Sequence, residues 1–142
     1  MSKNQNILST VTPWEMVAEG YAETTMKLFQ RYTEKALEVA NLSKESAILD
    51  VACGPGTLPL LAAGKVNSIH AIDFSESMIN LFKEEVEVRE LEKIEVHCGD
   101  GQELPFSDEM FDVAFSMFGL IFFPNRNKFE IRISNNRNSK RF

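Results

Sequence analysis

The sequence lacks the features of a membrane protein or of a disulfide-rich scaffold. No apolar run in its 142 residues reaches the ~20 residues that a membrane helix needs. Its two cysteines, Cys53 and Cys98, form no CxxC pair, so neither a zinc site nor a disulfide framework is expected. The first residues lack the apolar stretch of a secretory signal peptide. We therefore expect a reduced, cytoplasmic protein that does not interact with a membrane.

Positive charge is scarce over most of the chain. The net charge is −6, although the residues after Asn125 include six basic side chains and only one acidic side chain. The preceding residues are therefore strongly acidic, and an acidic body disfavours a nucleic-acid partner. The basic end of the chain is expected to be solvated.

Two common nucleotide-binding patterns are also absent. Residues 47–52 are apolar except for Asp50, which is typical of a strand buried in a parallel sheet. Gly54 and Gly56 then allow a sharp turn, and a helix is predicted from residue 57 or 58 to 63. Pro59 stands where a G-x-G-x-x-G motif needs its third glycine, and no P-loop pattern is complete. In doubly wound α/β folds, a strand, a glycine turn and a helix in this order form the entrance of a nucleotide-binding site.

An acidic residue ends the second predicted strand. Residues 68–72 favour a strand, and Asp73 follows it, nineteen residues after Gly54. An acid about twenty residues after the glycine turn binds ribose hydroxyls in this architecture. A carboxylate can accept hydrogen bonds from both hydroxyls. The turn and the acid together predict a nucleoside site, and Ser75 is expected to cap the helix that follows.

Further elements are predicted on both sides of this unit. Helices are expected before it, the first with Thr12 as N-cap and Glu15 completing a capping box, the second from Gly20 to about residue 42. A third strand is predicted over residues 94–98 and a fourth over residues 111–118. His70 and His97 fall within strands, where a lone histidine is usually structural, so neither is expected to be catalytic.

Four segments resemble, in order and spacing, the motifs of class I S-adenosylmethionine-dependent methyltransferases. The segment from Asp50 to Thr57 resembles the first motif, although Ala52 and Leu58 stand where that family has glycines. Residues 71–78 resemble its "D-x-S-x-x-M" segment, residues 99–106 its "G-D-A-x-x-L-P-F", and residues 111–118 its "F-D-x-V" strand. The resemblance implies an α/β fold with a doubly wound, Rossmann-like parallel sheet in strand order 3-2-1-4, helices on both faces and additional N-terminal helices.

The resemblance also implies a site for S-adenosylmethionine and its product, S-adenosylhomocysteine. In this family the acid at position 73 binds the ribose, and Phe74 would lie along the adenine. Asp100 would accept a hydrogen bond from the adenine amino group, and the Gly101 N–H would donate to a ring nitrogen. The expected cofactor-binding residues are Tyr21, Asp50, Ala52, Cys53, Gly54, Gly56, Thr57, Asp73, Phe74, Met78, Gly99, Asp100, Gly101, Ser116, Met117 and Phe118.

The implied reaction is methyl transfer to a small-molecule acceptor. The donor is already electrophilic, so no metal is expected and no general base is assigned. The apolar residues 121–123 favour a small or lipophilic acceptor. Two alternatives remain: a protein that binds S-adenosylmethionine without transferring its methyl group, and an NAD-dependent oxidoreductase, which Pro59 and the N-terminal helices disfavour.

The end of the chain does not continue the family pattern. We expect an N-terminal tail over residues 1–11, a methyltransferase-like domain over residues 12–125 and an atypical basic tail over residues 126–142. The family usually has seven strands, so the chain is expected to be a truncated form that lacks the later ones. We therefore expect impaired acceptor binding. We also expect either self-association, through the edge of strand four or through the tail, or marginal stability.

Overall fold

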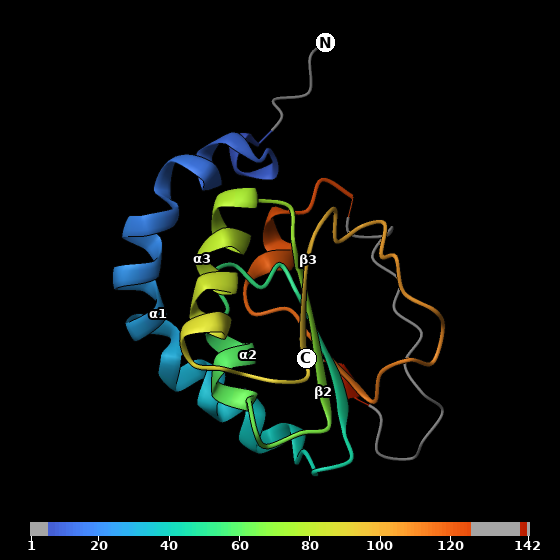
Figure 1. Cartoon of the computed structure of the whole chain (residues 1–142). Helices are drawn as coiled ribbons and strands as arrows, with labels where there is room; N and C mark the ends of the chain where they lie inside the picture. Colours follow the sequence, from blue (N-terminus) through green and yellow to red (C-terminus); the bar gives the residue numbers. More distant parts are fainter. Residues whose placement is uncertain (1–5, 126–139, 142) are drawn as a thin grey trace.

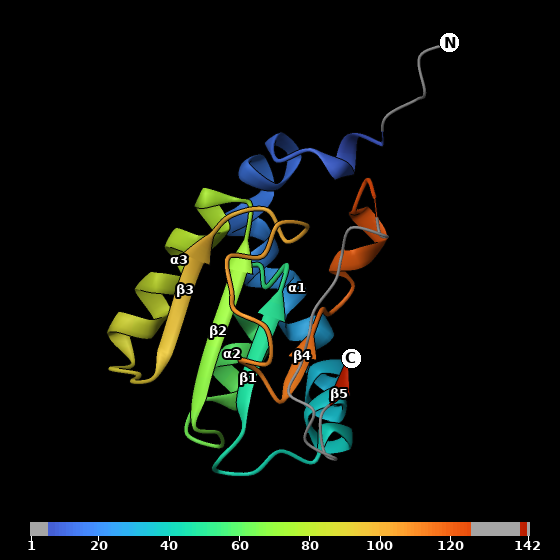
Figure 2. The same ribbon diagram turned by 90° about the vertical axis from the view of Figure 1, so that its right-hand side faces the viewer.

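The computed structural model describes residues 6–125 and 140–141, which form a parallel sheet with helices packed against it. Figure 2 shows the sheet in the order β3-β2-β1-β4-β5. The predicted order 3-2-1-4 is therefore confirmed. The strands are β1 (Ala47–Val51), β2 (Ser68–Asp73), β3 (Ile94–Cys98), β4 (Val113–Phe115) and β5 (Lys140–Arg141).

The first three strands match their predicted ranges to within one residue, whereas β4 is shorter than predicted. The apolar run over residues 111–118 contributes only three residues to the strand. Beyond them the chain turns away from the sheet, and Phe118 adopts a positive φ of 64° that no strand allows. The short β5 pairs in parallel with β4, placing Lys140 opposite Val113. Most of the predicted basic tail lies outside the described residues.

The N-terminal part of the protein forms one long helix, α1 (Thr12–Ala40), instead of the two that we predicted. Gly20 lies within it, and the Thr24 hydroxyl donates to the Gly20 carbonyl. Val11 rather than Thr12 occupies the N-cap position. The predicted capping box is also wrong, because the Glu15 carboxylate accepts hydrogen bonds from α3 instead. The other helices are η1 (Ile7–Ser9), α2 (Thr57–Ala62), α3 (Glu76–Val88) and η2 (Gly119–Phe122).

The Ser75 cap of α3 is confirmed, because its hydroxyl accepts a hydrogen bond of 3.2 Å from the Met78 N–H. This cap fixes where α3 begins, directly after β2 and Asp73. Although α1 has 29 residues, none of the helices within the described ranges is long and apolar enough to span a membrane.

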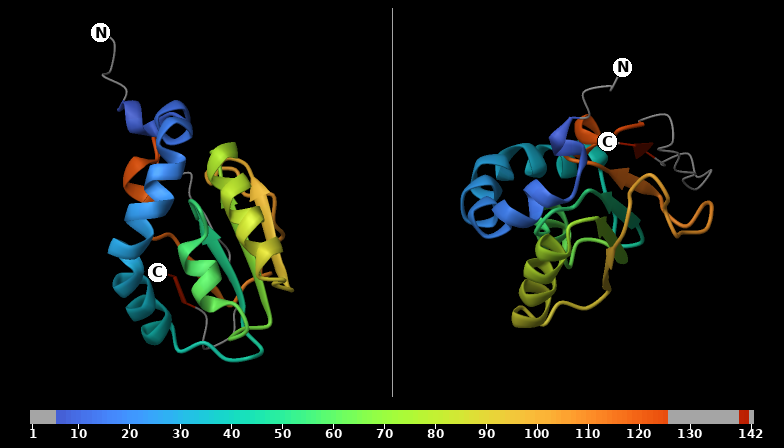
Figure 3. Two further views of the ribbon diagram at one scale, coloured as in Figure 1. Left: turned by 60° about the vertical axis from the view of Figure 1, so that its left-hand side comes forward. Right: turned by 90° about the horizontal axis from the view of Figure 1, so that it is seen from above.

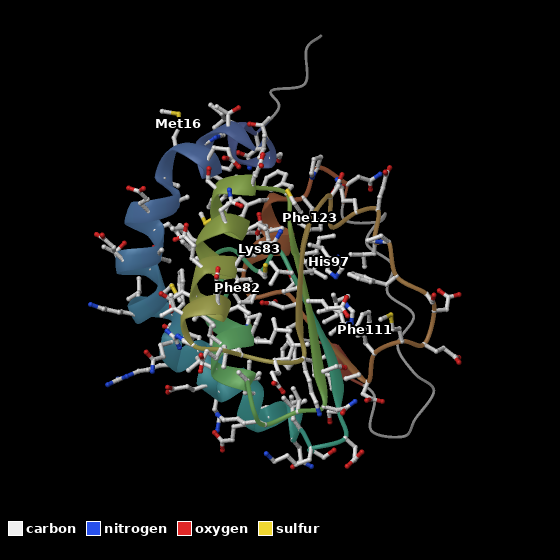
Figure 4. All side chains as sticks on the ribbon, in the orientation of Figure 1. Met16, Phe82, Lys83, His97, Phe111 and Phe123 are labelled. Carbon is white, nitrogen blue, oxygen red and sulfur yellow. The ribbon has the colours of Figure 1, made fainter. Side chains whose placement is uncertain are left out.

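The three α-helices lie on one face of the sheet (Figures 1 and 3). Phe82 of α3 is fully buried between that helix and the sheet, packed with Cys53, Ala71 and Ile79 (Figure 4). In the described part of the chain the opposite face is covered by the loop over residues 99–112, whereas the resemblance implied helices on both faces. Leu104, Phe106 and Phe111 of this loop pack on Leu49, Val51 and Ile72 of the sheet. This loop contains Pro105 and a polar turn at residues 107–109, which do not favour a helix.

Candidate functional site

A cavity of about 210 Å³ opens at the carboxyl ends of the central strands, between the glycine turn and the first part of α1. This is the edge at which doubly wound sheets bind ligands. The cavity brings together ten of the residues that the sequence predicts for a cofactor site. They are Tyr21, Ala52, Gly54, Asp73, Phe74, Met78, Asp100, Gly101, Met117 and Phe118.

The glycine turn forms the floor of the cavity. Its tight path requires positive φ angles at Ala52 (58°), Gly54 (55°) and Gly56 (94°). A Cβ added at Gly54 would meet only the Tyr21 ring at 4.0 Å, so the backbone there faces open space. A Cβ at Gly56 would lie 2.3 Å from the Phe82 ring. Gly54 therefore exposes bare backbone to a ligand, whereas Gly56 allows α3 to pack closely behind the turn.

Asp73 joins the end of β2 to this turn. One carboxylate oxygen accepts a 2.9 Å hydrogen bond from the Gly54 N–H, and the other accepts one of 2.9 Å from the Ser75 N–H. Burial raises the pKa of this carboxyl, and the backbone donors oppose that shift in part. Asp73 thus accepts a backbone hydrogen bond in the turn before α3, as a helix-capping residue does, and it also lines the cavity. Each of its oxygens keeps a lone pair for a further donor.

Two buried polar atoms beside the cavity have no hydrogen-bond partner among the described residues, Oδ1 of Asp50 and Oγ of Ser116. Asp50 is 2% exposed, and its pKa lies well above the usual value because of burial and the nearby charge of Asp73. Both residues lie close in sequence to the cavity-lining Ala52 and Met117. Orphaned polar atoms at such a position fit a site that binds a polar ligand.

The residues after β3 form the wall next to Asp73. The Asp100 carboxylate accepts a 2.8 Å hydrogen bond from the Gln102 N–H, which closes a turn over Asp100 and Gly101. A Cβ on Gly101 would lie 2.7 Å from Val51 and 2.8 Å from Phe123, so only glycine fits there. Gln102 lines the cavity too, and its side-chain oxygen accepts from the Asn125 N–H at 3.0 Å.

Aromatic side chains form another wall of the cavity. The Trp14 ring packs edge-on against Tyr21, with centroids 6.1 Å apart, and against Phe122 at 5.0 Å. Its indole N–H donates to the Leu8 carbonyl at 3.0 Å, which fixes the ring. Trp14 is therefore both a packing residue and a cavity residue.

Six predicted residues lie behind the lining rather than in it: Asp50, Cys53, Gly56, Thr57, Gly99 and Ser116. Cys53 is buried against α3, and burial raises the pKa of its thiol well above the usual value. Gly99 faces Ile72 of the sheet, with only 3.3 Å available for a Cβ.

Several lining residues were not among the predicted set: Ser9, Trp14, Gln102, Gly119, Phe122, Phe123 and Pro124. Phe122 and Phe123 belong to the apolar residues 121–123, from which a small or lipophilic acceptor is expected. Gln102 follows the Asp-Gly pair directly and could have been found from that position. Gly119 carries no signal in the sequence, although a Cβ there would lie 2.3 Å from Ala52.

Comparison with known proteins relates this geometry to a family. The demethylmenaquinone methyltransferase of Bacillus subtilis (strain 168) is 35% identical over 94 residues, which are 64% of this chain and 40% of that protein. A solved structure of a SAM-dependent methyltransferase from Aquifex aeolicus is 30% identical, with a TM-score of 0.60 over 68% of this chain and 53% of that one. A solved structure from Methanococcus maripaludis, 21% identical, shares the fold with a TM-score of 0.71 over 94% of this chain and 63% of that one.

The chain spans about 40% of the length of the curated relatives that it matches. A family model described as a methyltransferase domain matches residues 48–133, which is more than half of the chain. This segment contains the glycine turn, Asp73, Asp100 and the strands that hold them. On this evidence the protein belongs to the methyltransferase domain family.

Proposed function

We propose that the cavity binds S-adenosylmethionine and S-adenosylhomocysteine, and that the chain supplies the cofactor side of methyl transfer to a small molecule. The buried Asp73 carboxylate, bonded to the Gly54 N–H and open to the cavity, is the observation that carries this proposal. When bound, S-adenosylmethionine supplies a methyl group on a positively charged sulfur, which needs no metal to be electrophilic. The chain then has to hold and orient the cofactor in a site shielded from water.

Each wall of the cavity suits one part of that ligand. Asp73 would accept hydrogen bonds from the two ribose hydroxyls, and Asp100 would accept one from the adenine amino group. The N–H of Gly101 would donate to a ring nitrogen, and Phe74 would lie along the base. The close packing of Gly101 against Val51 and Phe123 supports this role, because it keeps the backbone of that wall in one position.

The acidic side chains at the cavity, Asp73 and Asp100 in its lining and the buried Asp50 behind it, favour a cation. Asp50 and Asp73 are buried close enough that the charge of Asp73 contributes to the raised pKa of Asp50. A positively charged ligand group would relieve this repulsion. S-adenosylmethionine carries an ammonium and a sulfonium, whereas NADH is an anion. The electrostatics therefore support the methyl donor over the nicotinamide cofactor that we considered as an alternative.

The proposed acceptor is a small or lipophilic molecule. Phe118, Phe122 and Phe123 line the cavity beyond the glycine turn, and they offer no acid or base. Positioning alone can supply about 7–11 kcal/mol to such a transfer. The Bacillus subtilis relative is named a demethylmenaquinone methyltransferase, so demethylmenaquinone is the first acceptor to assay. The same assay tests the impaired acceptor binding that the sequence predicts, and sedimentation equilibrium tests the proposed self-association.

Isothermal titration calorimetry with S-adenosylhomocysteine tests the cofactor proposal. Hydrogen bonds to a charged acceptor contribute ~1.5–3 kcal/mol each. Asp73→Ala should therefore weaken binding at least tenfold, whereas Asp108→Ala, which removes an exposed aspartate outside the cavity, should leave it unchanged. Equal affinities of the native chain and the Asp73→Ala variant would overturn the proposal.

A second titration tests the role of Asp100. Asp100→Ala should weaken binding of S-adenosylhomocysteine but not of an analogue that lacks the adenine amino group. Equal losses for both ligands would show that Asp100 only forms the turn with Gln102. Tight binding of NADH would favour the oxidoreductase alternative. Saturable S-adenosylmethionine binding without turnover on any acceptor would favour a binding protein without transferase activity.

A further inference from the structure

Three side chains that can bind metals meet on the loop-covered face of the sheet. His70 lies on β2 opposite Glu95 of β3, and His97 follows Glu95 by two residues. Residues two apart in a strand project to the same face, so the pairing register brings the three side chains together. Figure 4 shows His97 on this side of the sheet, away from Phe82 and the helices. None of the three residues lines the cavity described above.

The ligand atoms of this cluster lie close to one another. Nδ1 of His70 is 3.3 Å from Nε2 of His97. The Glu95 carboxylate oxygen is 3.7 Å from the first nitrogen and 3.8 Å from the second. Two ligands of a tetrahedral zinc ion, each bound at about 2.0–2.2 Å, are separated by roughly 3.3–3.6 Å. The two nitrogens already have this spacing, and the carboxylate needs to move by only a few tenths of an ångström.

The surroundings hold the imidazoles and leave the carboxylate free to adjust. Phe106 packs edge-on against both rings, at 5.5 Å from His70 and 5.1 Å from His97, and Phe111 packs on His70 at 5.3 Å. The side chain of His70 is 9% exposed and that of His97 32%, whereas Glu95 is 67% exposed. Two imidazoles packed against aromatic rings, with one exposed carboxylate at the rim, leave a coordination position for water.

A hydrogen bond between the two rings explains only part of this arrangement. It would account for the spacing of 3.3 Å between the nitrogens, but it does not require a carboxylate oxygen at nearly equal distances from both. The donor set also narrows the choice of ion. Calcium and magnesium prefer oxygen ligands, whereas two imidazoles and one carboxylate suit zinc and the neighbouring divalent transition metals.

We propose that His70, Glu95 and His97 form a binding site for a divalent transition-metal ion, with Zn²⁺ as the best match. The ion would link β2 to β3, with His70 three residues before Asp73 and His97 three residues before Asp100. The site is separate from the cofactor cavity, and the proposal does not depend on the proposed function. Its role is to hold together the two strands that lead to these aspartates.

Competition between the full chain and a chromophoric chelator for Zn²⁺ tests the site. The native protein, freed of metal, should bind one Zn²⁺ per chain. His70→Gln, His97→Gln and Glu95→Gln should each weaken Zn²⁺ binding at least tenfold, because each removes one of three ligands. Glu92→Gln removes an exposed glutamate just before β3 and should leave Zn²⁺ binding unchanged. Cys98→Ser should also leave it unchanged, because no thiolate takes part.

Cobalt gives an independent readout, because Co²⁺ bound by nitrogen and oxygen ligands shows visible bands without the thiolate band of a cysteine-bound ion. Glu95 is exposed, so Glu95→Gln should retain the native circular dichroism spectrum even if a histidine variant fails to fold. Absence of saturable Zn²⁺ binding by the native chain would overturn the proposal. Unchanged binding in the folded Glu95→Gln variant, or a tenfold loss in Cys98→Ser, would overturn it too.

Discussion

Gly56→Ala tests whether the glycine turn and α3 pack as described. The added Cβ would lie 2.3–2.6 Å from three carbons of the Phe82 ring, a side chain with no solvent exposure. The ring cannot move away without displacing the core around it. In addition, Gly56 has a φ of 94°, which other residues rarely adopt. Gly56→Ala therefore combines overpacking with backbone strain.

The expected cost follows from these two contributions. Overpacking a close-packed core costs about 1–3 kcal/mol, and a left-handed conformation costs a residue with a side chain ~1–2 kcal/mol. We therefore expect Gly56→Ala to lower the free energy of unfolding by about 2–5 kcal/mol. For a domain of this size that corresponds to a fall in Tm of roughly 6–15 °C.

Two other glycines provide matched controls. Gly64 has a φ of 73°, but a Cβ added there would meet nothing within 4 Å, so Gly64→Ala should cost only the strain of about 1–2 kcal/mol. Gly20 lies inside α1 with open space around it, so Gly20→Ala should stabilise the protein by ~0.5–1 kcal/mol. Urea unfolding followed by circular dichroism measures all three. If Gly56→Ala costs no more than Gly64→Ala, the close packing of Phe82 against the turn is refuted.

Three further substitutions probe the electrostatics and the aromatic wall. The folded-state pKa of Asp50 is raised, so ionisation of Asp50 destabilises the native state increasingly as the pH rises above the pKa that this residue has in the unfolded chain. Asp50→Asn should therefore add about 1–3 kcal/mol of stability at neutral pH and little at pH ~4. An equal gain at both pH values would contradict this. The hydrogen bonds from Ser77 and Ser75 lower the pKa of Glu15, so the Glu15 carboxylate stabilises the folded state at neutral pH and this stabilisation is lost as the pH falls. Glu15→Gln should therefore lower Tm at neutral pH only. A loss of Tm that persists in acid would argue against a charge effect. Trp14→Ala removes two aromatic contacts worth ~0.5–1.5 kcal/mol each and should weaken S-adenosylhomocysteine binding several-fold in a titration; unchanged affinity would separate the aromatic wall from the site.

The central part of the fold could be predicted from sequence because local signals agree there. The apolar runs of β1 and β2, the glycine turn and the Ser75 cap each specify the same strand–turn–helix order. The prediction of two N-terminal helices failed at Gly20. A glycine within a helix costs only about 1 kcal/mol, which the packing of a 29-residue helix along α2 and α3 easily offsets. The predicted fourth strand was too long for another reason. An apolar run does not reveal where a strand ends and a cavity wall begins.

The site was predictable where one motif defines one position and not where distant segments meet. Asp73 and Gly54 follow from a spacing of nineteen residues, and the structure joins them by a hydrogen bond. Phe123 reaches Gly101 only because the chain returns after β4, which no local pattern encodes. Similarly, His70 and His97 each look like an isolated strand histidine. Only the register of β2 against β3 places both beside Glu95.

A crystal structure of the chain with S-adenosylhomocysteine tests the central claim most directly. The account predicts the adenosine in the cavity, with both ribose hydroxyls donating to the Asp73 carboxylate and the adenine beside Asp100 and Gly101. The hydrogen bond from the Gly54 N–H to Asp73 should persist, since each carboxylate oxygen can accept a second donor. A ribose bound away from Asp73, or an empty cavity at saturating ligand, would contradict the account.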